Sequence, residues 1–80
     1  MTTVMVTGAT GFVGRQIMRS LGNTRVRLLP VVRMGKENLV SGLPNVQEVI
    51  STPDLFSEDP LWWSGQCSRA EIIVHAAWYT

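Results

Sequence analysis

Three glycines spaced three residues apart, Gly8, Gly11 and Gly14, constrain this 80-residue chain more than any other feature of its sequence. They follow a short β-branched and apolar run, residues 2–7, which predicts a strand buried on both faces. They lead into residues 12–21, where apolar side chains recur at helical spacing and polar side chains occupy the opposite side. The glycine run therefore predicts a buried strand, a tight turn and an amphipathic helix in direct succession.

A turn of this kind is suited to binding a phosphate group. The N-terminus of a helix presents unpaired N–H groups and the positive end of the helix dipole. Glycines let the backbone turn tightly and approach a dinucleotide pyrophosphate, because they carry no Cβ. The spacing differs from G-x-G-x-x-G, since position 9 is Ala9. The alternative is a strand-turn-helix with a purely structural role. The order of strand, glycines and helix favours a binding role over this alternative.

The composition is that of a globular protein. Apolar residues make up 45% of the chain and charged residues 16%, and the formal net charge is +1 with scattered basic side chains. We therefore expect no nucleic-acid partner. The single cysteine, Cys67, excludes an internal disulfide and fits a reducing compartment. Because no signal peptide and no apolar run of about 20 residues is visible, we expect a cytoplasmic chain without a membrane partner, and we predict no metal site.

The rest of the chain alternates strand and helix patterns. Strands are predicted at residues 26–33, 46–50 and 71–75, and short helices at residues 36–42 and from 60 to about 65. Asp59 and Pro60 have the pattern of an N-cap followed by proline at the first helical position. Pro30 weakens the second strand, because proline cannot donate to a sheet ladder, and we expect it to mark a bulge or an irregular start. This alternation predicts one α/β domain with a parallel sheet and right-handed crossovers.

The string from Thr7 to Gly14, TGATGFVG, resembles the cofactor loop of the short-chain dehydrogenase/reductase superfamily. It is most similar to the loop of the extended branch, the NAD-dependent epimerase/dehydratase family. Asp54-Leu55 and the run 73–77, IVHAA, agree with that family in order and spacing. The resemblance covers the whole chain. It implies a Rossmann-like sheet of strand order 3-2-1-4 with crossover helices, in which residues 1–80 are the N-terminal part of an NAD(P)-binding domain.

The resemblance also implies a set of cofactor-binding residues. The backbone N–H groups of Phe12 and Val13 would face the pyrophosphate, while their side chains are compatible with core packing. The Asp54 carboxylate and the Leu55 N–H would contact adenine, and the alternative for Asp54 is a cap of the turn that follows Pro53. The full predicted set is Gly8, Thr10, Gly11, Phe12, Val13, Gly14, Arg33, Asp54, Leu55, Ala76 and Ala77.

The residues at the end of the fourth predicted strand and just after it have both a binding and a packing interpretation. By resemblance, Ala76 and Ala77 are small residues against the riboses of the cofactor, and simple close packing is their alternative. As a histidine, His75 is a candidate acid or base. Within an apolar strand a histidine is more often structural, and the resemblance points the same way.

Arg33 is the feature that bears on the choice between NAD and NADP. It stands nineteen residues after Gly14, close to the position where an acidic residue would accept from the ribose 2′-hydroxyl of NAD. No acidic residue lies between Gly22 and Lys36. An arginine there suits a 2′-phosphate through charge-assisted, bidentate contact. We therefore favour NADP over NAD as the cofactor, with a solvated arginine at a strand end as the alternative.

The aromatic residues do not supply a catalytic centre. Trp62 and Trp63 are expected to pack within a short helix, and Trp78 and Tyr79 to lie on the loop that leaves the carboxyl edge of the sheet. The family uses a Tyr-x-x-x-Lys pair with a Ser or Thr, and a lysine partner for Tyr79 would fall beyond Thr80. By resemblance, we expect these 80 residues to bind cofactor without catalysing a reaction.

Two classes of function follow. In the first, the chain is the cofactor-binding part of a longer oxidoreductase or isomerase, of epimerase/dehydratase or carbonyl-reducing type, that acts on a small molecule such as a nucleotide-sugar. In the second, it belongs to a non-catalytic protein that senses NADP. In either case the fourth strand of a 3-2-1-4 sheet has an exposed edge, which predicts a homodimer or aggregation through that edge.

Overall fold

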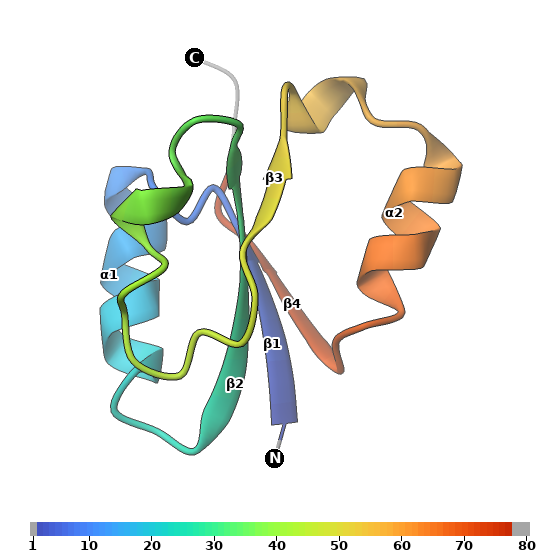
Figure 1. The fold of residues 1–80 in the computed structure, drawn as a ribbon. Helices are drawn as coiled ribbons and strands as arrows, with labels where there is room; N and C mark the ends of the chain where they lie inside the picture. Colours follow the sequence, from blue (N-terminus) through green and yellow to red (C-terminus); the bar gives the residue numbers. More distant parts are fainter. Residues whose placement is uncertain (1, 78–80) are drawn as a thin grey trace.

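Four strands run parallel in one sheet, in the order β3-β2-β1-β4. The computed structural model describes residues 2–77. Its elements are β1 (Thr2–Thr7), α1 (Phe12–Leu21), β2 (Val26–Arg33), the 3-10 helix η1 (Glu37–Leu39), β3 (Ile50–Thr52), the 3-10 helix η2 (Leu55–Ser57), α2 (Pro60–Cys67) and β4 (Ile72–His75). This is the α/β fold and strand order that the sequence predicts. Figure 1 shows the sheet between α1 and η1 on one side and α2 on the other.

Strand β1 lies between two neighbours, as its apolar sequence on both faces requires. Val4 is in register with Leu28 of β2 and with Ile72 of β4. Met5 and Val6, whose side chains point to opposite faces, are both fully buried. The central position of β1 places the loop that follows it, with its three glycines, in the middle of the carboxyl edge of the sheet.

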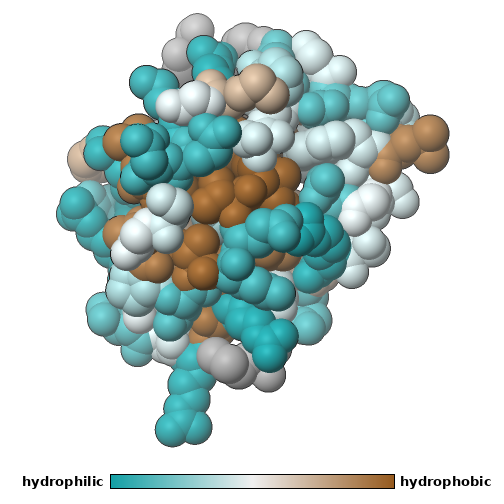
Figure 2. All heavy atoms as spheres, viewed as in Figure 1, coloured by the Kyte–Doolittle hydropathy of each residue, from teal (hydrophilic) through white to brown (hydrophobic). Residues whose placement is uncertain are grey.

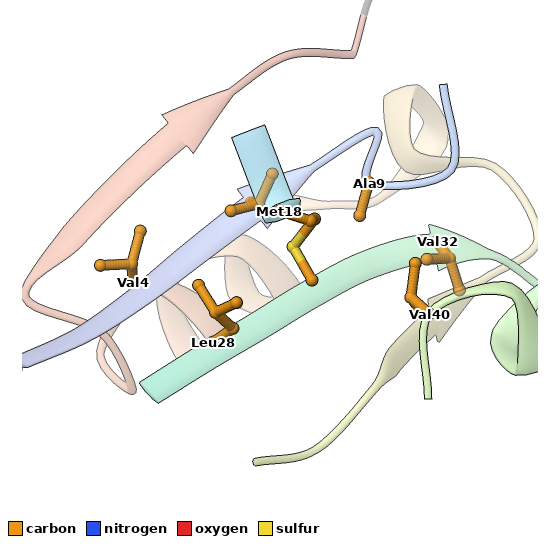
Figure 3. Close-up of a cluster of buried hydrophobic side chains, with 7 residues drawn as sticks. Val4, Ala9, Met18, Leu28, Val32 and Val40 are labelled. Atoms are coloured by element: carbon orange, nitrogen blue, oxygen red, sulfur yellow. The ribbon is translucent and has the colours of Figure 1, made fainter. Parts of the chain in front are cut away.

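A separate apolar cluster lies on each face of the sheet. On the α1 side, the fully buried Met18 reaches from the helix toward Val4 and Leu28 of the sheet (Figure 3). On the other side, Met5 belongs to a second cluster, against which Trp62 of α2 packs. From the viewpoint of Figure 1, hydrophobic side chains gather in the middle of the molecule and hydrophilic ones frame them (Figure 2). Apolar packing therefore stabilises the sheet on both faces.

The third strand begins later than the sequence predicts. Residues 46–50 were the expected strand, but β3 comprises Ile50–Thr52. Val46 forms only an isolated bridge, to Leu28 of β2, and residues 47–49 between the two pairings are not in a strand. Most of the predicted strand therefore precedes β3, and continuous pairing with β2 begins only at the last predicted residue, Ile50.

Pro30 accounts for this interruption. The N–H of Leu28 donates to the carbonyl of Asn45 at 2.8 Å, and the N–H of Met34 donates to the carbonyl of Thr52 at 2.9 Å. The backbone N–H groups of the even-numbered residues of β2 therefore point toward β3. Position 30 faces the same side by alternation, and proline has no N–H to donate there. The fully buried Pro30 thus stands opposite the stretch that leaves the ladder. Strand β2 itself runs without a break from Val26 to Arg33 and pairs with β1 in regular register, so the prediction of a bulge or an irregular start at Pro30 is wrong. The irregularity lies in the neighbouring strand.

The short helices differ in length from the predictions. Residues 36–42 contain only the single 3-10 turn η1. Helix α2 begins as predicted, because Asp59 Oδ1 accepts from the N–H of Trp62 at 2.8 Å and Pro60 is the first helical residue. It continues through Gly65 to Cys67, since a glycine inside a helix costs only about 1 kcal/mol and does not end it. Within residues 2–77 no helix has the length and apolarity needed to cross a membrane.

Strand β4 is an edge strand, as the predicted order 3-2-1-4 requires, but its apolar run is not buried as in an interior strand. Ile72 is 51% exposed and Ile73 is 43% exposed. Across residues 2–77, the only strand that pairs with β4 is β1. Edges are commonly guarded by lysine, proline or a bulge, and β4 contains neither lysine nor proline. The physical reason for the exposure is therefore position in the sheet, which the apolar pattern of the strand does not reveal.

We expect the isolated chain to self-associate through this edge, because unpaired backbone groups beside exposed isoleucines favour pairing with a second copy. Light scattering over a range of concentrations should show a mass above that of the monomer. Ile73→Lys, which places a charge on the edge, should restore the monomer. Leu61→Lys, which adds the same charge at an 83% exposed site on α2, should not. A monomer at all concentrations would contradict the prediction.

Candidate functional site

A pocket of about 580 Å³ lies at the carboxyl edge of the sheet, where all four strands end. The chain passes from β1 to β2 and β3 on one side and then returns to β4 on the other side of β1. Ligands of open α/β sheets bind at such a switch point. Ten of the eleven predicted cofactor-binding residues line the pocket, the exception being Gly14. The remaining lining residues, which the sequence did not single out for this site, are Val31, Val32, Thr52 and Phe56.

The glycine loop is shaped by the close approach of other backbone segments. Gly8 has a φ of +66°, which favours glycine, and a Cβ at this position would lie 2.8 Å from the Cα of Ala77. The N–H of Gly11 donates to the carbonyl of Gly8 at 3.0 Å and closes the turn. The loop therefore folds back on itself while touching the residues that follow β4.

Gly14 contributes from beneath the pocket. It is buried in the first turn of α1, and a Cβ there would lie 2.0 Å from the carbonyl oxygen of Gly8. No real Cβ tolerates that distance from a backbone atom, so only glycine lets the helix begin directly against the loop. Gly14 is therefore needed for packing against the loop, which explains why it belongs to the glycine pattern but does not line the pocket.

The start of α1 presents backbone donors at the pocket. Gly11 is the N-cap, and no side chain in the described part of the protein caps the helix. The first backbone bond of the helix joins the N–H of Arg15 to the carbonyl of Gly11 at 2.9 Å. The N–H groups of Phe12, Val13 and Gly14 precede that bond and have no acceptor within the helix. Together with the helix dipole, they form a site that suits an anion.

The side chains of Phe12 and Val13 do not pack in the core. Phe12 is 76% exposed and Val13 is 40% exposed, so the core-packing prediction is wrong for both. The first turn of α1 lies near the carboxyl ends of the strands, where little sheet remains to cover it (Figure 1). Apolar packing of α1 on the core begins with Ile17 and the buried Met18.

Arg33 is the last residue of β2 and lines the pocket with an exposed side chain. Among residues 2–77 the ion pair that forms is between Arg69 and Glu48, at 2.6 Å, and it lies elsewhere. The Arg33 guanidinium is thus available at the mouth of the pocket. Its charge complements an anionic group on a bound ligand.

Asp54 acts as a cap, as one of its two predicted readings requires. Its Oδ1 accepts from the N–H of Phe56 at 3.1 Å, and its Oδ2 accepts from the Ser57 hydroxyl at 2.8 Å. It also lines the pocket together with Leu55. The contact of Asp54 and Leu55 with adenine stays a prediction.

Phe56 is the most informative residue that sequence reasoning missed. It follows Asp54 by two positions in η2, lines the pocket and is 44% exposed. Thr52, at the end of β3, is almost fully buried and donates its hydroxyl to Glu58. An isolated aromatic residue in a predicted loop has no periodicity that would reveal its direction. Only the position of η2 beside the ends of the strands brings Phe56 to the pocket.

Ala76 and Ala77 lie where the end of β4 meets the glycine loop. The Ala76 N–H donates to the Thr7 carbonyl at 3.3 Å, and Ala77 lies against Gly8. Both residues also line the pocket. The close approach of Ala77 to Gly8 fits the packing alternative for that residue, and the contact of both alanines with riboses remains a prediction. Trp78 and Tyr79 fall outside the described residues.

Comparison with protein-family models, with curated protein sequences and with solved structures finds no match for this chain. The class of protein is therefore defined by its own structure. The chain is a Rossmann-like α/β unit with a parallel sheet of order 3-2-1-4. Its pocket lies at the switch point, between a glycine loop and the ends of the other three strands.

Two glycine-to-alanine changes separate the loop constraint from helix propensity. Gly14→Ala should destabilise the fold by about 1–3 kcal/mol, because the new Cβ collides with the Gly8 carbonyl. Gly65→Ala, inside α2 with no atom within 4 Å of the new Cβ, should stabilise it by about 0.5–1 kcal/mol. Urea unfolding followed by circular dichroism measures both. Equal effects of the two changes would contradict the role given to Gly14.

Proposed function

We propose that the pocket binds a nicotinamide dinucleotide, with NADP preferred to NAD. The observation that supports this most is the uncapped start of α1 beside the glycine loop, at the switch point of a parallel sheet. A pyrophosphate carries two negative charges and many acceptor oxygens. Those groups match the N–H donors of Phe12, Val13 and Gly14 and the positive end of the helix dipole.

The ends of the other strands supply the remaining contacts of this proposal. Arg33, exposed at the end of β2, would hold the 2′-phosphate that distinguishes NADP from NAD. Asp54 and Leu55 would contact adenine from the segment after β3. Ala76 and Ala77 would leave room for the riboses. Together with the glycine loop after β1, these residues come from the ends of four separate strands yet line one pocket, which supports a single extended ligand.

For the whole protein, we propose an oxidoreductase or isomerase of epimerase/dehydratase or carbonyl-reducing type. This rests on the resemblance of TGATGFVG to the extended dehydrogenase/reductase loop. A nucleotide-sugar is the substrate class we favour, and the nicotinamide ring would exchange hydride with it. The second candidate is a non-catalytic protein that senses NADP. A Tyr-x-x-x-Lys pair encoded downstream of Thr80 would favour catalysis, and a coding sequence without that pair would favour sensing.

The preference for NADP is tested by Arg33→Ala. Removing the guanidinium should weaken NADP binding by about 10–100-fold, since a charge-assisted hydrogen bond contributes about 1.5–3 kcal/mol. The affinity for NAD should hardly change, because NAD lacks the 2′-phosphate. Isothermal titration calorimetry of both nucleotides on the chain measures the two dissociation constants.

Arg27→Ala is the matched control for this experiment. Arg27 is exposed on the same strand, and at 3.3 Å per residue it lies about 20 Å from Arg33. It carries the same charge but cannot reach the pocket, so both affinities should stay at the wild-type value. If wild-type chain binds NAD as tightly as NADP, the preference for NADP is wrong. If it binds neither, the proposed function is wrong.

A further inference from the structure

His75 links the glycine loop to the end of the neighbouring strand. It is the last residue of β4, and its Nδ1 lies 2.7 Å from the hydroxyl oxygen of Thr7, the last residue of β1. Thr7 is fully buried and directly precedes Gly8. His75 directly precedes Ala76 and thus the segment that touches Gly8. The side-chain bond therefore joins the two strands one residue before both of them enter the pocket.

The imidazole ring of His75 also contacts two aromatic rings. Its centroid lies 6.2 Å from that of Phe56 at an interplanar angle of 77°, and 6.2 Å from that of Trp63 at 68°. Both are edge-to-face arrangements, which are favourable for aromatic pairs. Trp63 in turn meets Trp62 edge-on at 5.2 Å, and Trp62 packs on the core. His75 therefore contacts the pocket wall that η2 provides directly, through Phe56, and is connected to the core through the two tryptophans.

We propose that His75 is a positioning residue that holds three walls of the pocket in their relative places. The walls are the glycine loop, the segment Ala76-Ala77 and η2 with Phe56. His75 does not line the pocket, so it acts on a ligand only through these neighbours. The inference rests on the proposed function, since the ligand whose affinity reports the wall positions is the dinucleotide.

A residue that only stabilised the fold would behave differently. The His75 side chain is exposed over more than a third of its surface, so truncating it leaves no cavity in the core. Its partners, however, are Thr7 at the loop and Phe56 at the pocket wall. Binding sites lose affinity when their walls are displaced by even a fraction of an ångström. Ligand affinity should therefore fall by more than thermal stability would indicate.

The test is a double-mutant cycle on the dissociation constant of NADP, measured by calorimetry. His75→Ala should weaken binding about tenfold, the size expected for losing one hydrogen bond and its ring contacts. His75→Asn, whose amide lies as many bonds from Cβ as Nδ1 does, should recover part of that loss by restoring the bond to Thr7. Thr7→Val should weaken binding in the wild-type background and should have no further effect in His75→Ala.

Thr2→Val is the control for Thr7→Val, because Thr2 is exposed at the far end of the same strand. Amide exchange without ligand gives a second readout. The Ala76 N–H, bound to the Thr7 carbonyl, and the Gly11 N–H, bound to the Gly8 carbonyl, should exchange faster in His75→Ala than in wild type.

The outcomes separate the two proposals. If the wild type binds NADP and His75→Ala binds it equally well, or if the effects of Thr7→Val and His75→Ala simply add, the positioning role is wrong and the proposed function stands. If the wild type binds neither NADP nor NAD, the proposed function is wrong. In that case unchanged exchange at Ala76 and Gly11 would also overturn the positioning of the loop, and faster exchange would uphold it.

Discussion

The structure depends on a close approach of three backbone segments at the end of β1. A Cβ on Gly14 would collide with the carbonyl of Gly8, and a Cβ on Gly8 would collide with the backbone of Ala77. This contact seats the first turn of α1 directly on the loop and draws the end of β4 against it. The same contact leaves the first N–H groups of α1 directed toward open space instead of toward side chains. The pocket is the space that this packing creates.

The site combines the fixed dipoles at the start of α1 with the positive charge of Arg33. The N–H groups at the start of α1 are held by backbone geometry and cost nothing to orient when an anion arrives. Arg33 adds a full positive charge from the end of a different strand. The wall formed by η2 is held by the Asp54 cap and by the contact of Phe56 with His75. Under the proposed function, β1 and α1 would orient the ligand, and the ends of β2 and β3 would supply the selectivity among ligands.

Strong local signals predicted their elements correctly, and positions that depend on neighbours were predicted less well. The buried strand β1, the start of α1 at the glycine run and the Asp59 cap of α2 each follow from adjacent residues. The start of β3 was displaced because Pro30 acts on a strand that is distant in sequence. Phe12 and Val13 fit a helical apolar pattern, yet they lie beyond the sheet that would bury them. The exposure of Ile72 and Ile73 reflects the edge position of β4, for which a short apolar run has no marker.

By itself the sequence determined the turn, the helix start and the alternation that makes a parallel sheet, because these depend on glycine conformation, capping and periodicity over a few residues. It also singled out ten residues that line one pocket. Tertiary structure alone decided that Phe56 joins that pocket and that His75 connects Thr7 to the aromatic side chains of η2 and α2. Those contacts join residues up to 68 positions apart, and only the order of the strands in the sheet brings such residues together.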